Sequence, residues 1–336
     1  MRLLLASTAT ALLYTQGALA QALIFNTYLP PFDSVRKVLV EDFAARIGRQ
    51  SAGAIRVSVP AVSLAPSTRQ WDLVTSRVAD IAVIPIYTQR ARIVLPLLAD
   101  LPFNSVSARS ASMALWRTQE VYFSKFDEFR GVKLLGVFVL PPSRFVSKVR
   151  PVKAIGDFRG LRTWVPASEL SRSIAALGGA PVYSTLGQMF EYASKGTVDA
   201  LMTSPSAVKQ AHIGSYVHYM TEVPGGFGSV SFAVVINNAA WAGLGAKGQA
   251  ALLRAAEGLP ERVGAALDAR DKAGLAEVPL EINRTPGALT TRITSLLAFQ
   301  ESEWLAAARS RGLADPAAAL AYYRSQMNKE AGGDPH

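Results

Sequence analysis

The sequence has 336 residues, of which 50% are hydrophobic and 18% charged, and it contains no cysteine. This composition excludes a disordered chain, because it supplies apolar side chains for one large domain or two ordinary ones. The lack of cysteine excludes disulfides, thiolate metal sites, cysteine nucleophiles and a cysteine-linked lipid anchor. The formal net charge of +10 is spread over scattered Lys and Arg residues, which favours a basic surface over a nucleic-acid site.

The N-terminus has the pattern of a secretory signal peptide. After a short basic start, residues 3–14 are largely apolar and uncharged, and residues 18–20 form an A-x-A cleavage site. The apolar stretch is too short to span a membrane. We therefore expect residues 1–20 to be a cleaved signal peptide and the mature periplasmic chain to begin at Gln21.

After this segment, short β-rich runs alternate with amphipathic helical runs. In chain order, the first half predicts strand 22–26, helix 33–49, strand 55–59, helix 67–78, strand 80–85, helix 108–126 and strand 132–140. The second half predicts strands 144–149 and 161–165, helices 168–177 and 185–196, strands 198–202 and 230–236, and helices 249–276 and 290–311. Such alternation predicts an α/β architecture with largely parallel sheets.

Two segments of the sequence are similar to each other. Residues 70–83 and residues 188–202 each contain a helix, then an acidic residue, Asp80 or Asp199, and then a short apolar strand. Two similar α/β units predict two lobes. A crevice between lobes, at the carboxyl ends of strands, is where an α/β protein binds its ligand.

The sequence contains no recognisable catalytic or metal-binding pattern. Of the three histidines, His336 is the last residue, and His212 and His218 are six apart, which does not place them on one helix face. One match to the dinucleotide pattern G-x-G-x-x-G, residues 243–248, does not directly follow a strand, and we interpret it as a loop. We therefore predict no metal, no cofactor and no enzymatic activity.

Several short motifs occur in order along the chain. They are RQSAGAIRV at 49–57, RVADIA at 77–82, LPF at 101–103, DFRGLRTWVP at 157–166, LGGAP at 177–181 and GTVDA at 196–200. In this order the chain resembles the extracytoplasmic solute-binding proteins of TRAP transporters, the C4-dicarboxylate type. The resemblance covers about residues 22–327.

This resemblance implies a two-lobed periplasmic binding protein of the Venus-flytrap type, with long C-terminal helices that brace both lobes. The first lobe would comprise residues 21–139 and 229–268, and the second residues 140–228 and 269–330. The lobes would close around a small organic acid and deliver it to a TRAP membrane permease. We expect a monomer that binds no nucleic acid.

Two departures from the family fall in the expected binding site. The family has a ligand-clamping arginine where this chain has Trp164, and often has Q-E-N-P where it has Thr203 and Ser204. The resemblance implies that Arg144 is a second arginine that faces the ligand. Arg162 is two residues from Trp164 and leaves the strand on the same side, so the two arginines could replace the missing charge.

An indole offers a flat apolar face and one N–H donor, whereas a guanidinium binds a carboxylate at two points. We therefore expect a monocarboxylate with a ring or apolar portion rather than a C4-dicarboxylate. Trp164 could also simply pack at the end of a strand. Further aromatic candidates, each equally compatible with core or rim packing, are Tyr28, Trp71, Tyr87 and Tyr183.

Two other functions stay open at this point. A ligand-binding module of the same fold could serve a sensor without any transporter, and a permease pair encoded beside the gene would argue against it. An exported hydrolase is the third hypothesis, and no set of residues in the sequence supports it.

The signal peptide generates the first prediction. N-terminal sequencing of the exported protein should start at Gln21, because residues 18–20 match the small-residue cleavage pattern. A periplasmic chain that still begins at Met1, or one that carries a lipid, would contradict this expectation.

Overall fold

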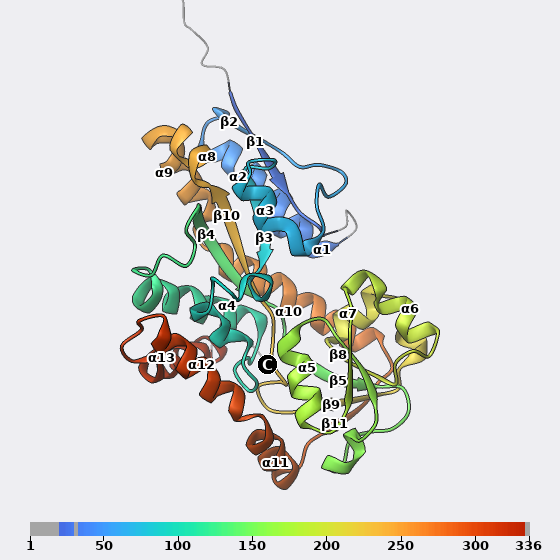
Figure 1. Ribbon diagram of the computed structural model, residues 1–336. Coiled ribbons are helices and arrows are strands. Elements are labelled where there is room, and N and C mark those ends of the chain that lie inside the picture. The colour runs from blue at the N-terminus through green and yellow to red at the C-terminus, as the bar shows by residue number, and fades with distance from the viewer. Residues whose placement is uncertain (1–19, 30–32, 333–336) are drawn as a thin grey trace, which may run out of the picture.

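The computed structural model describes residues 20–29 and 33–332. Two β-sheets, each covered by helices on both faces, form two lobes (Figure 1). The predicted two-lobed α/β fold is therefore confirmed. The alternation of strands and helices predicted largely parallel sheets, but both sheets are mixed, because β10 and β5 each run antiparallel to both of their neighbours.

The first lobe is built on a five-stranded sheet with the order β2-β1-β3-β10-β4. β1, β2 and β3 are parallel, while β10 arrives late in the chain and runs antiparallel between β3 and β4. The strands are β1 (Gln21–Asn26), β2 (Ile55–Ser58), β3 (Ile81–Pro85), β4 (Val132–Val139) and β10 (Ser231–Asn237).

The second lobe is built on a six-stranded sheet with the order β11-β9-β5-β8-β6-β7. β6 is parallel to β7 and β8, β9 is parallel to β11, and β5 is antiparallel to β8 and β9. The strands are β5 (Arg144–Ser147), β6 (Arg162–Val165), β7 (Ala180–Tyr183), β8 (Ala200–Thr203), β9 (Tyr219–Glu222) and β11 (Glu281–Arg284).

Helices cover both faces of the first sheet. On one face, Phe25 packs with Phe43, Leu252 and Val263 from three helices, and on the other face Trp71 packs against Ile84. The helices are α1 (Ser34–Arg36), η1 (Lys37–Glu41), α2 (Asp42–Gln50), η2 (Ser67–Arg69), α3 (Gln70–Thr75), η3 (Ile86–Gln89), η4 (Leu95–Asp100), α4 (Ala108–Thr118), η5 (Gln119–Phe123), α8 (Asn238–Gly243), α9 (Gly245–Ala256) and α10 (Leu259–Glu277).

The second sheet is covered in the same way. Phe145 packs with Ile174 and Ile293 on one face, while Val146 packs with Met189 and Val208 on the other. The helices are η6 (Ile155–Phe158), α5 (Ser168–Ala176), η7 (Leu186–Gln188), α6 (Met189–Ser194), α7 (Pro205–Gln210), η8 (Gly214–Tyr216) and α11 (Gly287–Leu297).

Two of the long predicted helices are broken. The helix predicted over 249–276 divides at Gly258, whose φ of +67° places its backbone in the left-handed region that favours glycine. The helix predicted over 290–311 divides at Ala298 into α11 and α12 (Phe299–Ser310). Residues 243–248, the isolated glycine pattern, were interpreted as a loop, but all except Leu244 are helical: Gly243 ends α8, and residues 245–248 form the first turn of α9.

Helix α10 passes from the first lobe to the second. It packs against α4 of the first lobe and against α7 of the second. Glycine permits both contacts: a Cβ atom on Gly264 would lie 2.5 Å from the Cα of Arg109, and one on Gly274 would lie 2.6 Å from the amide nitrogen of Ser206. Any larger residue would push the helices apart, so these glycines set how closely each lobe approaches α10.

Two chain segments beside α10 also connect the lobes. Residues 140–143 lead from β4 to β5, and residues 223–230 return from β9 to β10. They are hydrogen-bonded to each other, since the amide of Ser143 donates to the carbonyl of Gly228 and the amide of Phe227 donates to the carbonyl of Ser143. The two crossings therefore form one short ribbon.

The C-terminal helices brace both lobes. α11 packs on the second lobe, but Trp304 of α12 and Tyr323 of α13 (Pro316–Ala331) lie in one apolar cluster with Leu115 of α4, in the first lobe. All of residues 269–330 were expected to belong to the second lobe. The structure differs because the chain crosses back to the first lobe after α11.

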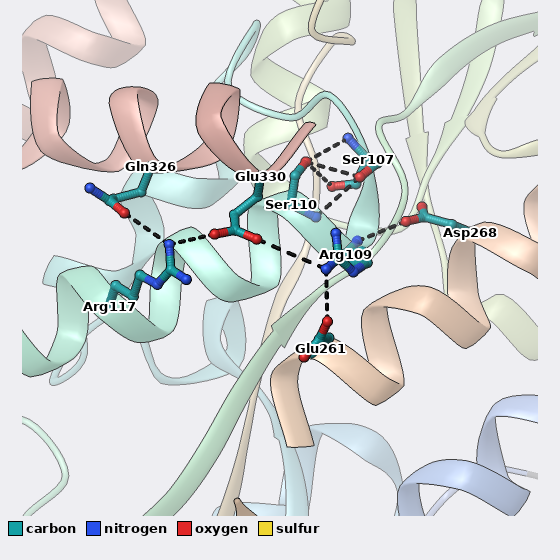
Figure 2. A network of polar contacts seen from close by, with 8 residues as sticks. All are labelled: Ser107, Arg109, Ser110, Arg117, Glu261, Asp268, Gln326 and Glu330. Atoms are coloured by element: carbon teal, nitrogen blue, oxygen red, sulfur yellow. Dashed lines mark hydrogen bonds and ion pairs between the residues drawn. The ribbon is translucent and has the colours of Figure 1, made fainter. Parts of the chain in front are cut away.

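A polar network fastens α13 to the first lobe (Figure 2). Arg109 of α4 bridges Glu261 of α10 and Glu330 of α13 at 2.7 and 4.0 Å. Arg117, two turns further along α4, binds Glu330 at 2.5 Å and Gln326 at 2.9 Å. Helix α4 thus connects α10 and α13 through the charged side chains of Arg109 and Arg117.

The same network generates a stability prediction. The carboxylate of Asp268 on α10 accepts hydrogen bonds from the amides of Ala108 and Arg109, at 2.7 and 2.8 Å, at the N-terminus of α4. Because a carboxylate there satisfies free amides and the helix dipole, Asp268→Ala should lower the free energy of unfolding by about 1–2 kcal/mol in urea titrations. Asp127→Ala is the control, since Asp127 is largely exposed. Equal losses in both variants would refute the role of Asp268.

Candidate ligand-binding cleft

A cavity of about 250 Å³ lies between the two lobes. The first lobe contributes Thr68, Tyr87 and Thr88 to its lining, and the second lobe contributes Ser168 and Tyr183. Tyr87 lies two residues after β3, and Tyr183 is the last residue of β7. The cavity therefore lies at the carboxyl ends of strands, as the sequence analysis expected of a ligand site.

Two of the tyrosines predicted as site residues, Tyr87 and Tyr183, line this cavity, whereas Tyr28 is not among its lining residues. Tyr28 follows β1, the neighbour of β3 in the first sheet. Burial raises the pKa of Tyr87 to about 12, and burial together with the nearby Tyr87 raises the pKa of Tyr28 well above its ordinary value. Both hydroxyl groups therefore stay protonated at neutral pH and can donate a hydrogen bond.

Arg144 lies at the cleft edge of the second sheet. It begins β5 and pairs in register with Thr203, the last residue of the antiparallel β8. Its Nε donates to Oε1 of Glu222 at 3.0 Å, and its Nη1 donates to Oδ2 of Asp271 at 2.7 Å. Nη2 makes no hydrogen bond to any residue that the structure describes. Two carboxylates thus fix the plane of the guanidinium and leave one nitrogen available.

The neighbouring polar residues Thr203 and Ser204 lie at the same edge. Thr203 is buried at the end of β8. Ser204 is the N-cap residue of α7, and its hydroxyl accepts a hydrogen bond from the amide of Ala207 at 3.3 Å. The structure thus brings Arg144, Thr203 and Ser204 together.

Arg162 lies at the end of the second sheet that faces away from the cleft. It begins β6, whose carboxyl end faces the cleft. Its Nε and Nη2 bind the two carboxylate oxygens of Asp199 at 2.9 and 2.7 Å. This two-point ion pair occupies the guanidinium at the surface, so the structure does not bring Arg162 to the cleft.

Both predicted tryptophans lie in apolar cores. Trp164 packs with Met189 in the second lobe, and its Nε1 donates to the hydroxyl of Ser184 at 2.7 Å. Trp71 is buried under α3 in the first lobe, where the guanidinium of Arg92 lies 4.7 Å from its ring centre. Neither indole lines the cavity, because each strand or helix turns that side chain towards its own core.

Three charged groups near the cavity were not predicted from the sequence. Arg90 follows η3 and forms an ion pair with Glu169 at the start of α5, in the other lobe. Asp100 is buried, and burial raises its pKa well above the ordinary value for an aspartate. No motif marks these residues, since their positions depend on how the lobes meet.

Within residues 20–29 and 33–332, no group of three His, Cys, Asp or Glu side chains could hold a metal ion. None of the helices in this part of the chain is long and apolar enough to cross a membrane. The residues around the cavity are instead hydroxyl, aromatic and charged side chains, which suit direct binding of a small polar solute.

Comparisons with known proteins agree with this architecture. A crystal structure of a TRAP periplasmic solute-binding protein from Bordetella bronchiseptica, with bound (R)- and (S)-mandelate, is 29% identical; the match covers 92% of this chain and 99% of that one, with a TM-score of 0.86. A TRAP periplasmic solute-binding protein from Desulfovibrio salexigens has the same fold, at 24% identity and a TM-score of 0.83, over 94% of this chain and 98% of that one.

A curated relative spans the same length. The outer membrane transporter protein TsaT of Comamonas testosteroni is 28% identical over 331 residues, which are 97% of each chain. The family model of the bacterial extracellular solute-binding proteins, family 7, matches residues 25–278, a range that contains both sheets except β11 and the first four residues of β1. The chain therefore belongs to family 7 of the bacterial extracellular solute-binding proteins, the family of the TRAP periplasmic receptors.

Proposed function

We propose that this chain binds a monocarboxylate with a ring or apolar portion between its two lobes and presents it to a TRAP permease. The observation that carries the proposal is the cavity at the strand ends, where Tyr87 from one lobe and Tyr183 from the other meet. The relative from Bordetella bronchiseptica supports it, since that protein was crystallised with mandelate, a monocarboxylate with an aromatic ring.

The size and lining of the cavity favour a small aromatic solute. A volume of about 250 Å³ is below the ~300–1,000 Å³ usual for drug-sized ligands. Tyrosine rings offer flat apolar faces for a ring, and their hydroxyl groups offer donors for its polar substituents. This selection comes from the tyrosines rather than from Trp164, which lies in the core of the second lobe.

Arg144 is our proposal for the partner of the carboxylate. Glu222 and Asp271 hold its guanidinium in place, and Nη2 is left for a further acceptor. The resemblance to the family pointed to Arg144, and the two-residue spacing from Trp164 pointed to Arg162; of the two, only Arg144 lies at the cleft end of its strand. A guanidinium with a fixed plane loses little entropy on binding, which strengthens its pairing with a carboxylate.

The cell compartment is part of the same proposal. The family acts in the periplasm, and the expected cleavage after Ala20 would release the chain there as a monomer. Residues 1–19 lie outside the described residues, so cleavage at this site stays a prediction.

The ligand class can be tested directly. Mass spectrometry of solutes released from the denatured purified protein should identify an organic acid, and thermal-shift assays should show stabilisation by mandelate or benzoate but not by succinate or malate. The reason is that a second carboxylate would be buried without a partner. Tyr87→Phe should reduce the shift, whereas Tyr122→Phe, distant on η5, should not. Stronger stabilisation by succinate than by any ring-bearing acid would refute the proposed ligand class.

The charge partner has a matched control in the same sheet. Arg144→Ala should weaken binding of the identified acid by about 3–5 kcal/mol in calorimetry, because it removes one partner of a desolvated charge pair. Arg144→Lys should recover part of that loss by keeping the charge near Glu222 and Asp271. Arg162→Ala, which removes an arginine at the opposite edge, should leave affinity unchanged. If Arg144→Ala binds as tightly as the native protein, Arg144 is structural only.

A further inference from the structure

Two polar contacts join the lobes across the cleft. Arg90 of the first lobe meets Ser168 and Glu169 of the second, and Asp33 of the first lobe meets Gln210 of the second. Arg90, Ser168 and Glu169 lie shortly after the carboxyl ends of β3 and β6, while Asp33 is the N-cap residue of α1 and Gln210 is the last residue of α7. The contacts are therefore made only when the two sheets face each other at this separation.

The first contact is ionic. Nη1 of Arg90 lies 2.6 Å from Oε1 of Glu169 and donates to the hydroxyl of Ser168 at 3.2 Å. That hydroxyl donates in turn to Oε2 of Glu169 at 2.7 Å. The side chain of Glu169 is only 16% exposed, while that of Arg90 is 49% exposed. A carboxylate this buried depends on its partner for charge compensation.

The second contact is a hydrogen bond to a buried carboxylate. Nε2 of Gln210 donates to Oδ2 of Asp33 at 2.6 Å, and Nη1 of Arg270 on α10 binds Oδ1 at 2.9 Å. The carboxylate also accepts from the amide of Val35 at 2.7 Å. Asp33 is thus held from the first lobe, from α10 and from the second lobe at once.

These contacts flank the tyrosines of the proposed site. Ser168 lines the same cavity as Tyr87 and Tyr183. The charge of Glu169 contributes to the raised pKa of Tyr87, and the charge of Asp33 contributes to that of Tyr28, so each contact lies near one tyrosine. The first contact therefore lies at the cavity itself, and the second lies beside Tyr28.

We propose that Arg90 and Glu169 are positioning residues that hold the lobes together over the solute and so set the affinity for every solute that the cleft accepts. This inference rests on the proposed function, because it assumes that the solute lies between the lobes. The ion pair lies wholly within the protein, so it stabilises the closed arrangement by the same amount whichever acid is bound. Any ligand that binds only the closed arrangement then gains the same factor in affinity from the ion pair.

A different role for Arg90 predicts the opposite outcome for one variant. If Arg90 instead bound the carboxylate of the solute directly, Glu169 would compete with the solute for the guanidinium. Glu169→Gln would then release Arg90 and tighten binding. In the role that we propose, the same variant removes the ion pair and weakens binding, so the sign of the change separates the two.

The experiment combines affinity with a distance measurement. Since the chain has no cysteine, Leu253→Cys on α9 and Val149→Cys in the second lobe, both exposed in the structure, can carry a spin-label pair without background labelling. The closed fraction should fall in Arg90→Ala and in Glu169→Gln and return in the charge-swapped double variant, Arg90→Glu with Glu169→Arg. Lys195→Ala and Glu191→Gln are matched controls, because they remove an ion pair within α6.

Calorimetry on the same variants gives the second readout. Each single variant should weaken binding of mandelate and of benzoate by one common factor, about two- to fivefold for a partly exposed ion pair. High salt should lower the affinity of the native protein for each acid and so reduce its difference from the variants. An unchanged closed fraction, a factor that differs between the two acids, or tighter binding by Glu169→Gln would overturn the inference. If neither acid binds, the distances still test the ion pair, while the proposed ligand class alone fails.

Discussion

The relative position of the lobes depends on how closely each one approaches α10. A Cβ atom at Gly264 would overlap the backbone of α4, and one at Gly274 would overlap the backbone at the start of α7. The two glycines lie on one continuous helix, so α10 packs against the first lobe at Gly264 and against the second lobe at Gly274. These two packing contacts set the spacing of the sheets. That spacing allows Tyr87 to lie near Tyr183 and Arg90 to pair with Glu169 across the cleft.

The fold was predictable to the extent that buried apolar residues recur with a regular period. β3, β4 and β10 are mostly apolar runs and were predicted close to their observed bounds. β7, β9 and β11 were missed. Most residues of β7 and β11 are exposed, and only two residues of β9 are buried, so none of these strands gives a clear periodic signal. The break at Gly258 was missed because glycine within a helical pattern marks an end only when its backbone turns left-handed, and the sequence does not show φ.

Site residues could be predicted where their position follows from the end of a single strand. Tyr28, Tyr87 and Tyr183 follow or end strands, and strand ends meet at the cleft. The roles of Arg162 and Trp164 depend on partners elsewhere in the chain, Asp199 and Ser184, which spacing along the sequence does not reveal. For the same reason, nothing in the local sequence distinguished Arg90 from the other scattered basic residues.

The ribbon formed by residues 140–143 and 223–230 has a mechanical consequence. Because its two segments are hydrogen-bonded to each other, they form one connection about which the lobes can rotate rather than two independent ones. The ribbon is closely packed at Gly225 and Gly226, because a Cβ atom on Gly225 would lie 2.5 Å from the carbonyl oxygen of Phe103 and one on Gly226 would lie 2.5 Å from the Cβ of Pro142. Rotation about such an axis displaces each atom in proportion to its distance from the ribbon. A small rotation of the lobes about the ribbon therefore separates distant groups more than nearby ones. The contacts between the lobes that lie farthest from the ribbon are the first to break.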